Sequence, residues 1–124
     1  MNVRPRLFGY LGVVLLVTTL PALVFAGAGA ALGNLVEWVL TSLASVAYVV
    51  GGFGNPIRER VGWFRAVGLG NVLLGLSLPA TAILDGSVTT PFGFVLAVGG
   101  LGLVAIGVDY IRGGKWTSVD TEAA

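Results

Sequence analysis

The residue best placed to do chemistry in this sequence is Glu37, a carboxylate inside an otherwise apolar stretch from Leu35 to Leu40. An ionisable side chain within a membrane-spanning segment is a candidate for ion binding or proton transfer. Glu37 also suits a helix start, because Asn34 precedes it by three residues in the order of a capping box. A negative charge near a helix N-terminus is favoured by the helix dipole. Both readings of Glu37 stand, as a candidate ion or proton site and as part of a helix cap.

No catalytic constellation accompanies this carboxylate. The sequence has no histidine and no cysteine, so the usual zinc ligands and the usual proton shuttle near neutral pH are absent. The glycine-rich segment Gly51–Asn55 is not followed by the Lys-Ser/Thr pair of a phosphate-binding loop. We therefore expect no catalytic residue, no cofactor, no metal site and no enzymatic activity, and we expect no nucleic-acid partner.

The composition indicates what kind of element must position these side chains. The chain has 124 residues, of which 56% are hydrophobic and 10% charged, whereas soluble domains carry about a quarter charged residues. Most of the surface is therefore expected to face lipid. Four stretches approach the roughly 20 apolar residues that a spanning helix needs. These expected spans are residues 7–26, 35–53, 64–84 and 91–111 of a single transmembrane domain, 1–124. A cleaved signal peptide is the rival reading of the first stretch, whose apolar run is longer than a usual signal core.

The basic residues predict the direction of the spans. Arg4 and Arg6 precede the first span, the arginines of residues 58–65 lie between the second and third, and Arg112 and Lys115 follow the fourth. All seven basic residues thus fall on one side, which by the positive-inside rule is cytoplasmic. Both termini are expected on that side. Aromatic residues near the expected span ends predict interfacial anchoring: Trp38 outside, and Tyr10, Trp63, Phe64, Tyr110 and Trp116 inside.

A repeated phrase predicts an internal duplication. Residues 11–22 and 69–80 are identical at eight of twelve positions. The expected fold is therefore an all-α, integral membrane four-helix bundle made of two tandem parallel helical-hairpin repeats, about 7–54 and 65–112. The repeat places Pro21 and Pro79 at equivalent positions. They are candidate kinks, either shaping a cavity on the outer side or acting as ordinary packing bends.

Proline removes a backbone donor, and in a membrane a nearby hydroxyl can satisfy the carbonyl group that is left without a partner. Thr18 and Ser77 lie shortly before the two prolines. We expect their hydroxyl groups to take this part.

Glycines spaced by seven residues predict close helix packing. They lie on the expected third and fourth spans: Gly68, Gly75, Gly93, Gly100 and Gly107. Such faces pack helices within one bundle, or they form a self-association face between protomers. Asn71 in the third span is expected to form an interhelical hydrogen bond.

The basic loop between the second and third spans carries Arg58, Arg60 and Arg65. These arginines are candidate contacts for anionic lipid or for a partner protein, and they also fix topology. Gly54, Asn55 and Pro56 are expected to end the second helix. The polar tail, residues 115–124, is expected to be flexible.

The chain's composition and topology resemble one known group of proteins. Six arginines stand against one lysine, glycine, alanine and valine abound, and the tail is acidic and alanine-rich. In size, span count and basic inner loops, the chain resembles the small four-span proteins in the envelopes of pleomorphic haloarchaeal viruses. This resemblance implies a protein that lines a viral envelope beside a spike protein. The chain lacks the first-span glutamate of small multidrug transporters and the threonine-phenylalanine motif of fluoride channels.

We expect a structural or assembly role, through glycine-mediated packing with itself or with a membrane partner. The protein is expected in the cell membrane or a viral envelope, with the lipid bilayer and a homo-oligomer or membrane protein as partners. Two alternatives remain open. One is an oligomeric channel or transporter for a small ion or solute, and the other is an accessory subunit of a larger membrane complex.

Overall fold

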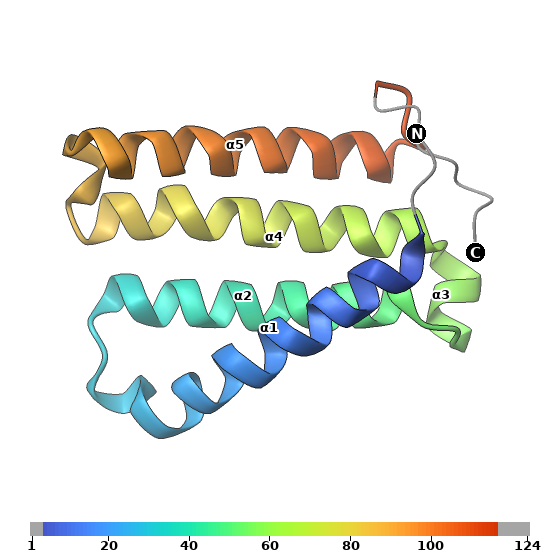
Figure 1. Cartoon of the computed structure of the whole chain (residues 1–124), viewed down its shortest axis with the longest axis horizontal. Helices are drawn as coiled ribbons and strands as arrows, with labels where there is room; N and C mark the ends of the chain where they lie inside the picture. Colours follow the sequence, from blue (N-terminus) through green and yellow to red (C-terminus); the bar gives the residue numbers. More distant parts are fainter. Residues whose placement is uncertain (1–3, 117–124) are drawn as a thin grey trace.

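The computed structural model describes residues 4–116 of the chain, which form helices joined by short turns (Figure 1). The four long helices are α1 (Pro5–Ala26), α2 (Leu32–Gly52), α4 (Trp63–Leu84) and α5 (Pro91–Ile111). A short helix, α3 (Pro56–Val61), lies between α2 and α4, and two single-turn 3₁₀ helices, η1 (Gly27–Gly29) and η2 (Ser87–Thr89), occupy the other turns. Of the expected tail, residues 117–124 lie outside the described part.

The four long helices are long and apolar enough to cross a membrane. The shortest of them have 21 residues, which at about 1.5 Å per residue gives roughly 32 Å. The hydrocarbon core of a bilayer is about 30 Å thick. By length and composition, the expectation of an all-helical protein with four potential spans is confirmed.

The long helices pack in an open row and do not close on one another. Helix α1 packs on α2, α2 on α4 and α4 on α5, while α1 scarcely touches α4. Helices α4 and α5 run side by side along their whole length, whereas α1 crosses α2 obliquely and diverges from it toward Ala26 (Figure 1). The two helix pairs that the repeat predicts to be equivalent are therefore packed differently.

The turn between α2 and α4 is more ordered than a simple loop. Asn55 is the N-cap of α3 and accepts a hydrogen bond from the Arg58 amide at 2.8 Å. Its side-chain nitrogen donates to the carbonyls of Val50 and Phe53, each at 2.8 Å. Pro56 at the first helical position suits a helix start. Gly62, with a φ of 94°, then redirects the chain into α4.

The aromatic core lies at the end of the molecule where α1 begins and α5 ends. It consists of Tyr48, Trp63, Val67 and Tyr110, with Phe8 packed against it. The Phe8 ring lies 5.7 Å from Tyr48 and 6.3 Å from Tyr110, and Trp63 lies 6.3 Å from Tyr110, between ring centroids. Trp63 and Tyr110 are buried, so the prediction that they anchor at the membrane interface is wrong. Together with Phe8 and Tyr48, these two residues join the four long helices at one end of the molecule.

Candidate functional site

Burial in this molecule is the reverse of that in a soluble protein. The large exposed side chains are mainly valine, leucine, isoleucine and phenylalanine, and they cover the outer faces of all four long helices. Apart from the aromatic core, the buried side chains are alanines or polar groups, and the polar ones are Thr41, Ser42, Ser45, Asn71, Ser77 and Asp109. Since lipid is as apolar as leucine, large apolar groups gain nothing from the interior, while polar groups must find partners there. This distribution suits a lipid surrounding.

The buried polar groups concentrate along one face of α2. Glu37, Thr41 and Ser45 follow one another at intervals of four residues and so share a face. Ser45 donates to the Thr41 carbonyl at 2.7 Å. Tyr48, one turn further on, donates to the Asn71 side-chain oxygen on α4. The interhelical hydrogen bond expected of Asn71 is thus confirmed.

A second polar contact joins α1 to α2. The hydroxyl groups of Thr19 and Ser42 lie 3.3 Å apart, and Thr19 also donates to the Leu15 carbonyl at 2.7 Å. Within the described residues, no buried side-chain nitrogen or oxygen lacks a hydrogen-bond partner. The fully buried polar atoms of this face are therefore paired within the described part of the chain.

Glu37 does not belong to a helix cap. Helix α2 begins at Leu32, three residues before the expected start, and its N-cap is Ala31, which makes no side-chain capping bond. The predicted capping box is wrong, because Asn34 already lies inside the helix. Glu37 falls in the second turn and is partly buried. In the described part of the chain, no group of three or more potential metal-binding side chains comes together. Glu37 thus stands at the N-terminal end of the polar face of α2, and not in such a group.

Asp109 is the most deeply buried carboxylate among the described residues, with no exposed surface. Its side-chain oxygen accepts a hydrogen bond from the Trp116 amide at 2.9 Å, and its backbone carbonyl accepts one from Gly114 at 2.8 Å. The Arg112 guanidinium lies over the Trp116 ring, 4.7 Å from its centroid. Asp109 therefore holds the segment after α5 folded back against the end of that helix.

The glycines spaced by seven residues face one another between α4 and α5. A Cβ atom built at Gly100 would lie 2.5 Å from the Gly75 carbonyl oxygen, and one built at Gly75 would lie as close to that of Gly100. Gly68 and Gly107 form the same reciprocal pair at 2.6 Å. Gly93 packs against the Ser87 carbonyl of η2. The structure uses these glycines for packing inside the chain.

The two prolines lie in different surroundings. Pro21 is exposed on α1, whereas Pro79 is partly buried and its Cδ atom lies near Gly100. The predicted role of the hydroxyl groups is wrong. Thr18 donates to the carbonyls of Val14 and Leu15, and Ser77 donates to that of Leu74. Neither bond is to the carbonyl four residues before its proline, because these hydroxyl groups reach back within their own turn.

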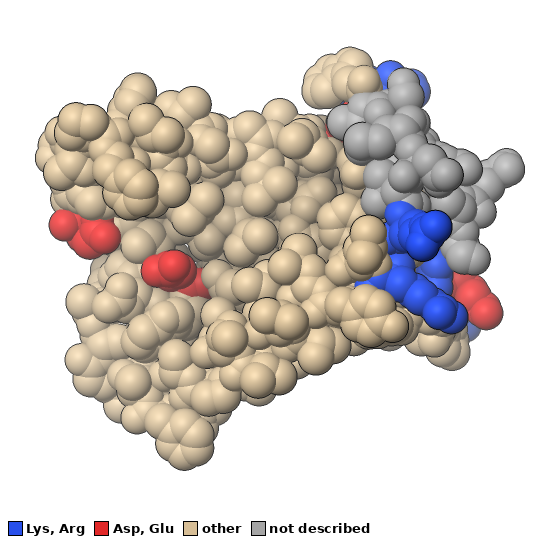
Figure 2. Space-filling view, viewed as in Figure 1, with Lys and Arg blue, Asp and Glu red and all other residues tan. Residues whose placement is uncertain are grey.

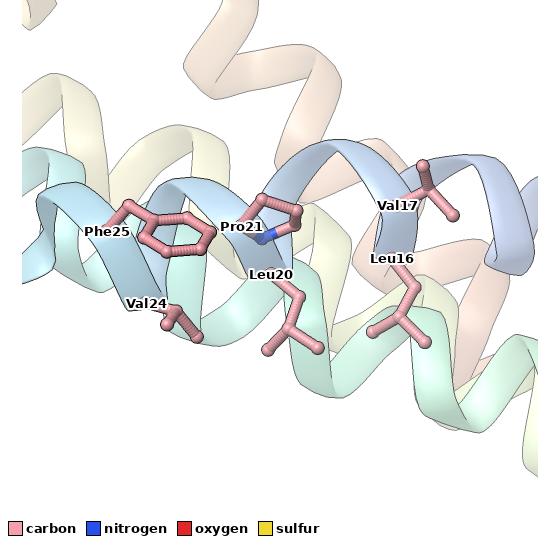
Figure 3. Close-up of a pocket in the computed structure, with 6 residues that line it drawn as sticks. All are labelled: Leu16, Val17, Leu20, Pro21, Val24 and Phe25. Atoms are coloured by element: carbon pink, nitrogen blue, oxygen red, sulfur yellow. The ribbon is translucent and has the colours of Figure 1, made fainter.

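The part of α1 that diverges from α2 carries an apolar groove (Figure 3). Its lining comes from this helix alone: Leu16, Val17, Leu20, Pro21, Val24 and Phe25. Phe25 is 88% exposed, so most of its aromatic ring is left uncovered by the described residues. The groove includes Pro21, one of the two prolines that the sequence indicated as candidates for shaping a cavity.

The basic residues gather at the end of the molecule that holds the aromatic core (Figure 2). We call this surface the basic end; it is formed by Arg4, Arg6, Arg58, Arg60, Arg65, Arg112 and Lys115. The predicted contact residues Arg58 and Arg60 lie on α3, and Arg65 lies in the first turn of α4. Sequence reasoning treated this stretch as a turn. The Asn-Pro pair before an amphipathic stretch is a helix-start signal that would have revealed α3.

Comparison with curated proteins and comparison with solved structures give no match. One protein family does match, over residues 3–123, and it is described as a family of unknown function (DUF7994). The match covers nearly the whole chain, including all four long helices. The chain therefore belongs to the DUF7994 family.

Proposed function

We propose that this protein is an integral membrane protein with a structural or assembly role, which it performs by packing α1 against a second copy or a membrane partner. The observation that carries the proposal is the divergence of α1 from the row of helices. In the apolar 18-residue segment that makes α1 a potential span, 6% is buried within the structure. The corresponding share for α4 is 39%. The groove of α1 therefore offers apolar surface and a proline-bearing backbone to a neighbouring helix.

The proposal places the binding face on α1 and not on the heptad glycines. Those glycines already face one another between α4 and α5. Membrane helices associate through van der Waals packing and interhelical hydrogen bonds. Thr18, exposed beside the groove, supplies a hydroxyl group to such an interface. Lining an envelope membrane beside a larger partner, as the resemblance to haloarchaeal viral proteins implies, is one concrete form of this role.

The proposed orientation has both termini in the cytoplasm. Its support is that all seven basic residues belong to the basic end, whereas Asp85 lies in the turn between α4 and α5 at the opposite end. The proposed origin is duplication of a helical hairpin, supported by the eight matched positions in residues 11–22 and 69–80. A single cysteine at Thr89 or at Lys115, labelled in intact cells, tests the orientation. Labelling of the second and protection of the first would contradict it.

The direct test is the mass of the complex extracted in mild detergent from its native membrane, with its companions identified. We expect a species heavier than the 12.7 kDa chain in detergent, either as a small homo-oligomer or with a dominant membrane partner. A stable partner of larger mass would make the protein an accessory subunit. A bare monomer at every detergent concentration would contradict an assembly role.

The second candidate function is conduction of a small ion or solute by an oligomer. The observation that favours it is the polar face of α2, on which Glu37, Thr41 and Ser45 follow one another. Replacing Glu37 with Gln removes the charge and keeps the shape. Loss of ion flux in proteoliposomes without loss of folding would favour conduction, and unchanged flux would favour the assembly role. A non-enzymatic role is proposed in both cases, because the chain has neither histidine nor cysteine.

A further inference from the structure

Among the described residues, positive charge exceeds negative charge at the basic end. All seven lysine and arginine residues of the chain lie there, and all but Arg58, which is partly buried, are exposed. The described acidic residues at this end are Glu59 and the fully buried Asp109. In Figure 2 the blue groups accordingly concentrate at one end of the molecule, while residues other than Lys, Arg, Asp and Glu, drawn in tan, cover most of its length.

Helix α3 gives this surface an apolar edge as well as charge. Ile57 and Val61, one turn apart, are 59% and 41% exposed. Arg58 and Arg60 flank them on the same short helix. A helix with apolar side chains on one face and arginines beside them suits the boundary between headgroups and acyl chains. The three hydrogen bonds of Asn55 hold α3 in place against the end of α2.

Two of the arginines are positioned by aromatic rings. The Arg65 guanidinium lies 5.4 Å from the centroid of the Phe64 ring, and its nitrogen donates to the Val61 carbonyl at 3.4 Å. Arg112 lies over Trp116, which is 68% exposed and is held by Asp109 through its amide. A stacked guanidinium loses less freedom when it forms further hydrogen bonds, and its planar edge matches the oxygens of a phosphate.

We propose that the basic end binds the phosphate headgroups of anionic phospholipids in the leaflet that it faces. The positive charge of the basic end favours an anionic ligand. The exposed apolar side chains of Ile57 and Val61 favour an anion that carries acyl chains beside its charge. An acidic protein segment would satisfy the arginines but not the apolar edge of α3. The inference rests on the proposed function only in requiring that the chain span a bilayer.

The test uses the whole protein in nanodiscs of phosphatidylcholine and phosphatidylglycerol in equal parts, with retained lipids counted by native mass spectrometry. We expect wild type to retain phosphatidylglycerol about five-fold over phosphatidylcholine and to lose this preference as salt is raised. The triple variant R58Q/R60Q/R65Q, which leaves four of the seven cations, should lower this preference clearly. The matched variant R58K/R60K/R65K, which keeps the charge, should retain most of it.

Two further variants keep the test decisive. E37Q/D85N removes charge away from the basic end and should leave the preference unchanged. R60Q alters one exposed side chain and should lower the preference measurably even if the triple variant does not fold.

Equal retention of the two lipids by wild type, or an undiminished preference in the glutamine variants, would overturn the inference and leave the assembly role intact. Capture of an acidic protein that depends on these arginines, without any lipid preference, would also overturn it. Failure of wild type to enter the nanodisc would overturn both the inference and the proposed function.

Discussion

At the scale of single residues, glycines without a Cβ atom determine how closely α4 and α5 approach each other. The reciprocal pairs Gly75–Gly100 and Gly68–Gly107 bring the backbone of each helix against a carbonyl of the other. Gly99 and Gly102 on the same helix have no atom within 4 Å of a built Cβ. The chain therefore contains glycines that packing requires and glycines that it does not.

This contrast gives a matched pair of substitutions. Gly100→Ala should destabilise the protein by about 1–3 kcal/mol, because the new methyl group overlaps the Gly75 carbonyl and the two helices must separate. Gly102→Ala should be neutral or stabilising, since alanine is the better helix former by up to about 1 kcal/mol. Reversible unfolding in mixed micelles measures both. Equal losses in the two variants would show that α5 does not pack on α4 through Gly100.

Asp85 gives the turn between α4 and α5 a dependence on pH. Its carboxylate accepts a hydrogen bond from the Ser87 amide at 2.8 Å, and this bond lowers the pKa of Asp85 below its ordinary value. A group whose pKa is lowered by folding stabilises the fold above its unfolded pKa, and the contribution is lost as the pH falls through the folded pKa. Hydrogen exchange at the Ser87 amide should therefore show lower protection at acidic pH. The Asp85→Asn variant should lack this change, and an identical pH profile in both would refute the argument.

At the scale of elements, the two helical hairpins differ in how far their close contact extends. Helices α4 and α5 meet at glycine pairs one heptad apart, so they stay together along their length. Helix α1 meets α2 closely where Gly9 contacts Gly52 and where Gly12 faces the Ser45 carbonyl. Beyond that crossing, α1 carries leucine, threonine and valine, and it diverges. The shared phrase of residues 11–22 and 69–80 therefore does not produce equivalent packing.

Asn55 connects two helices, because it caps α3 and bonds to the end of α2, and its loss should lower the stability of the fold. Asn55→Ala removes an N-cap and two bonds to the end of α2, and it should cost about 1 kcal/mol of stability. Asn34→Ala is the control, because Asn34 lies exposed inside α2 and is not its N-cap. Thermal unfolding followed by circular dichroism measures the difference. Equal effects of the two substitutions would mean that the Asn55 cap contributes nothing to the fold.

The sequence predicted those features that depend on composition and local spacing. Apolar length predicted four potential spans, and the amide of Asn71 in an apolar segment predicted an interhelical hydrogen bond. It did not predict that Trp63 and Tyr110 are buried, because an aromatic residue near a span end suits an interface and a core equally well. How far the α1 segment around Pro21 stands away from α2 (Figure 1) depends on a crossing angle, which no local pattern specifies.

At the scale of the whole molecule, an open row of helices leaves surfaces that a closed bundle would cover. The aromatic core joins the long helices at the basic end, and the described chain shows no comparable aromatic cluster at the opposite end. The part of α1 near Phe25 consequently has apolar side chains that the described residues leave exposed. We propose that another helix, from a second copy or a membrane partner, covers this part of α1.

The most direct test is cysteine cross-linking in the native membrane. The chain has no cysteine, so Val24→Cys places a single thiol in the groove of α1, and Val95→Cys places one on the exposed face of α5 as the control. We expect Val24→Cys to form a covalent adduct, with a second copy or a membrane partner, and Val95→Cys to remain at the mass of one chain. Cross-linking of Val95→Cys as efficient as that of Val24→Cys, or no adduct of Val24→Cys with any reagent length, would contradict this proposal.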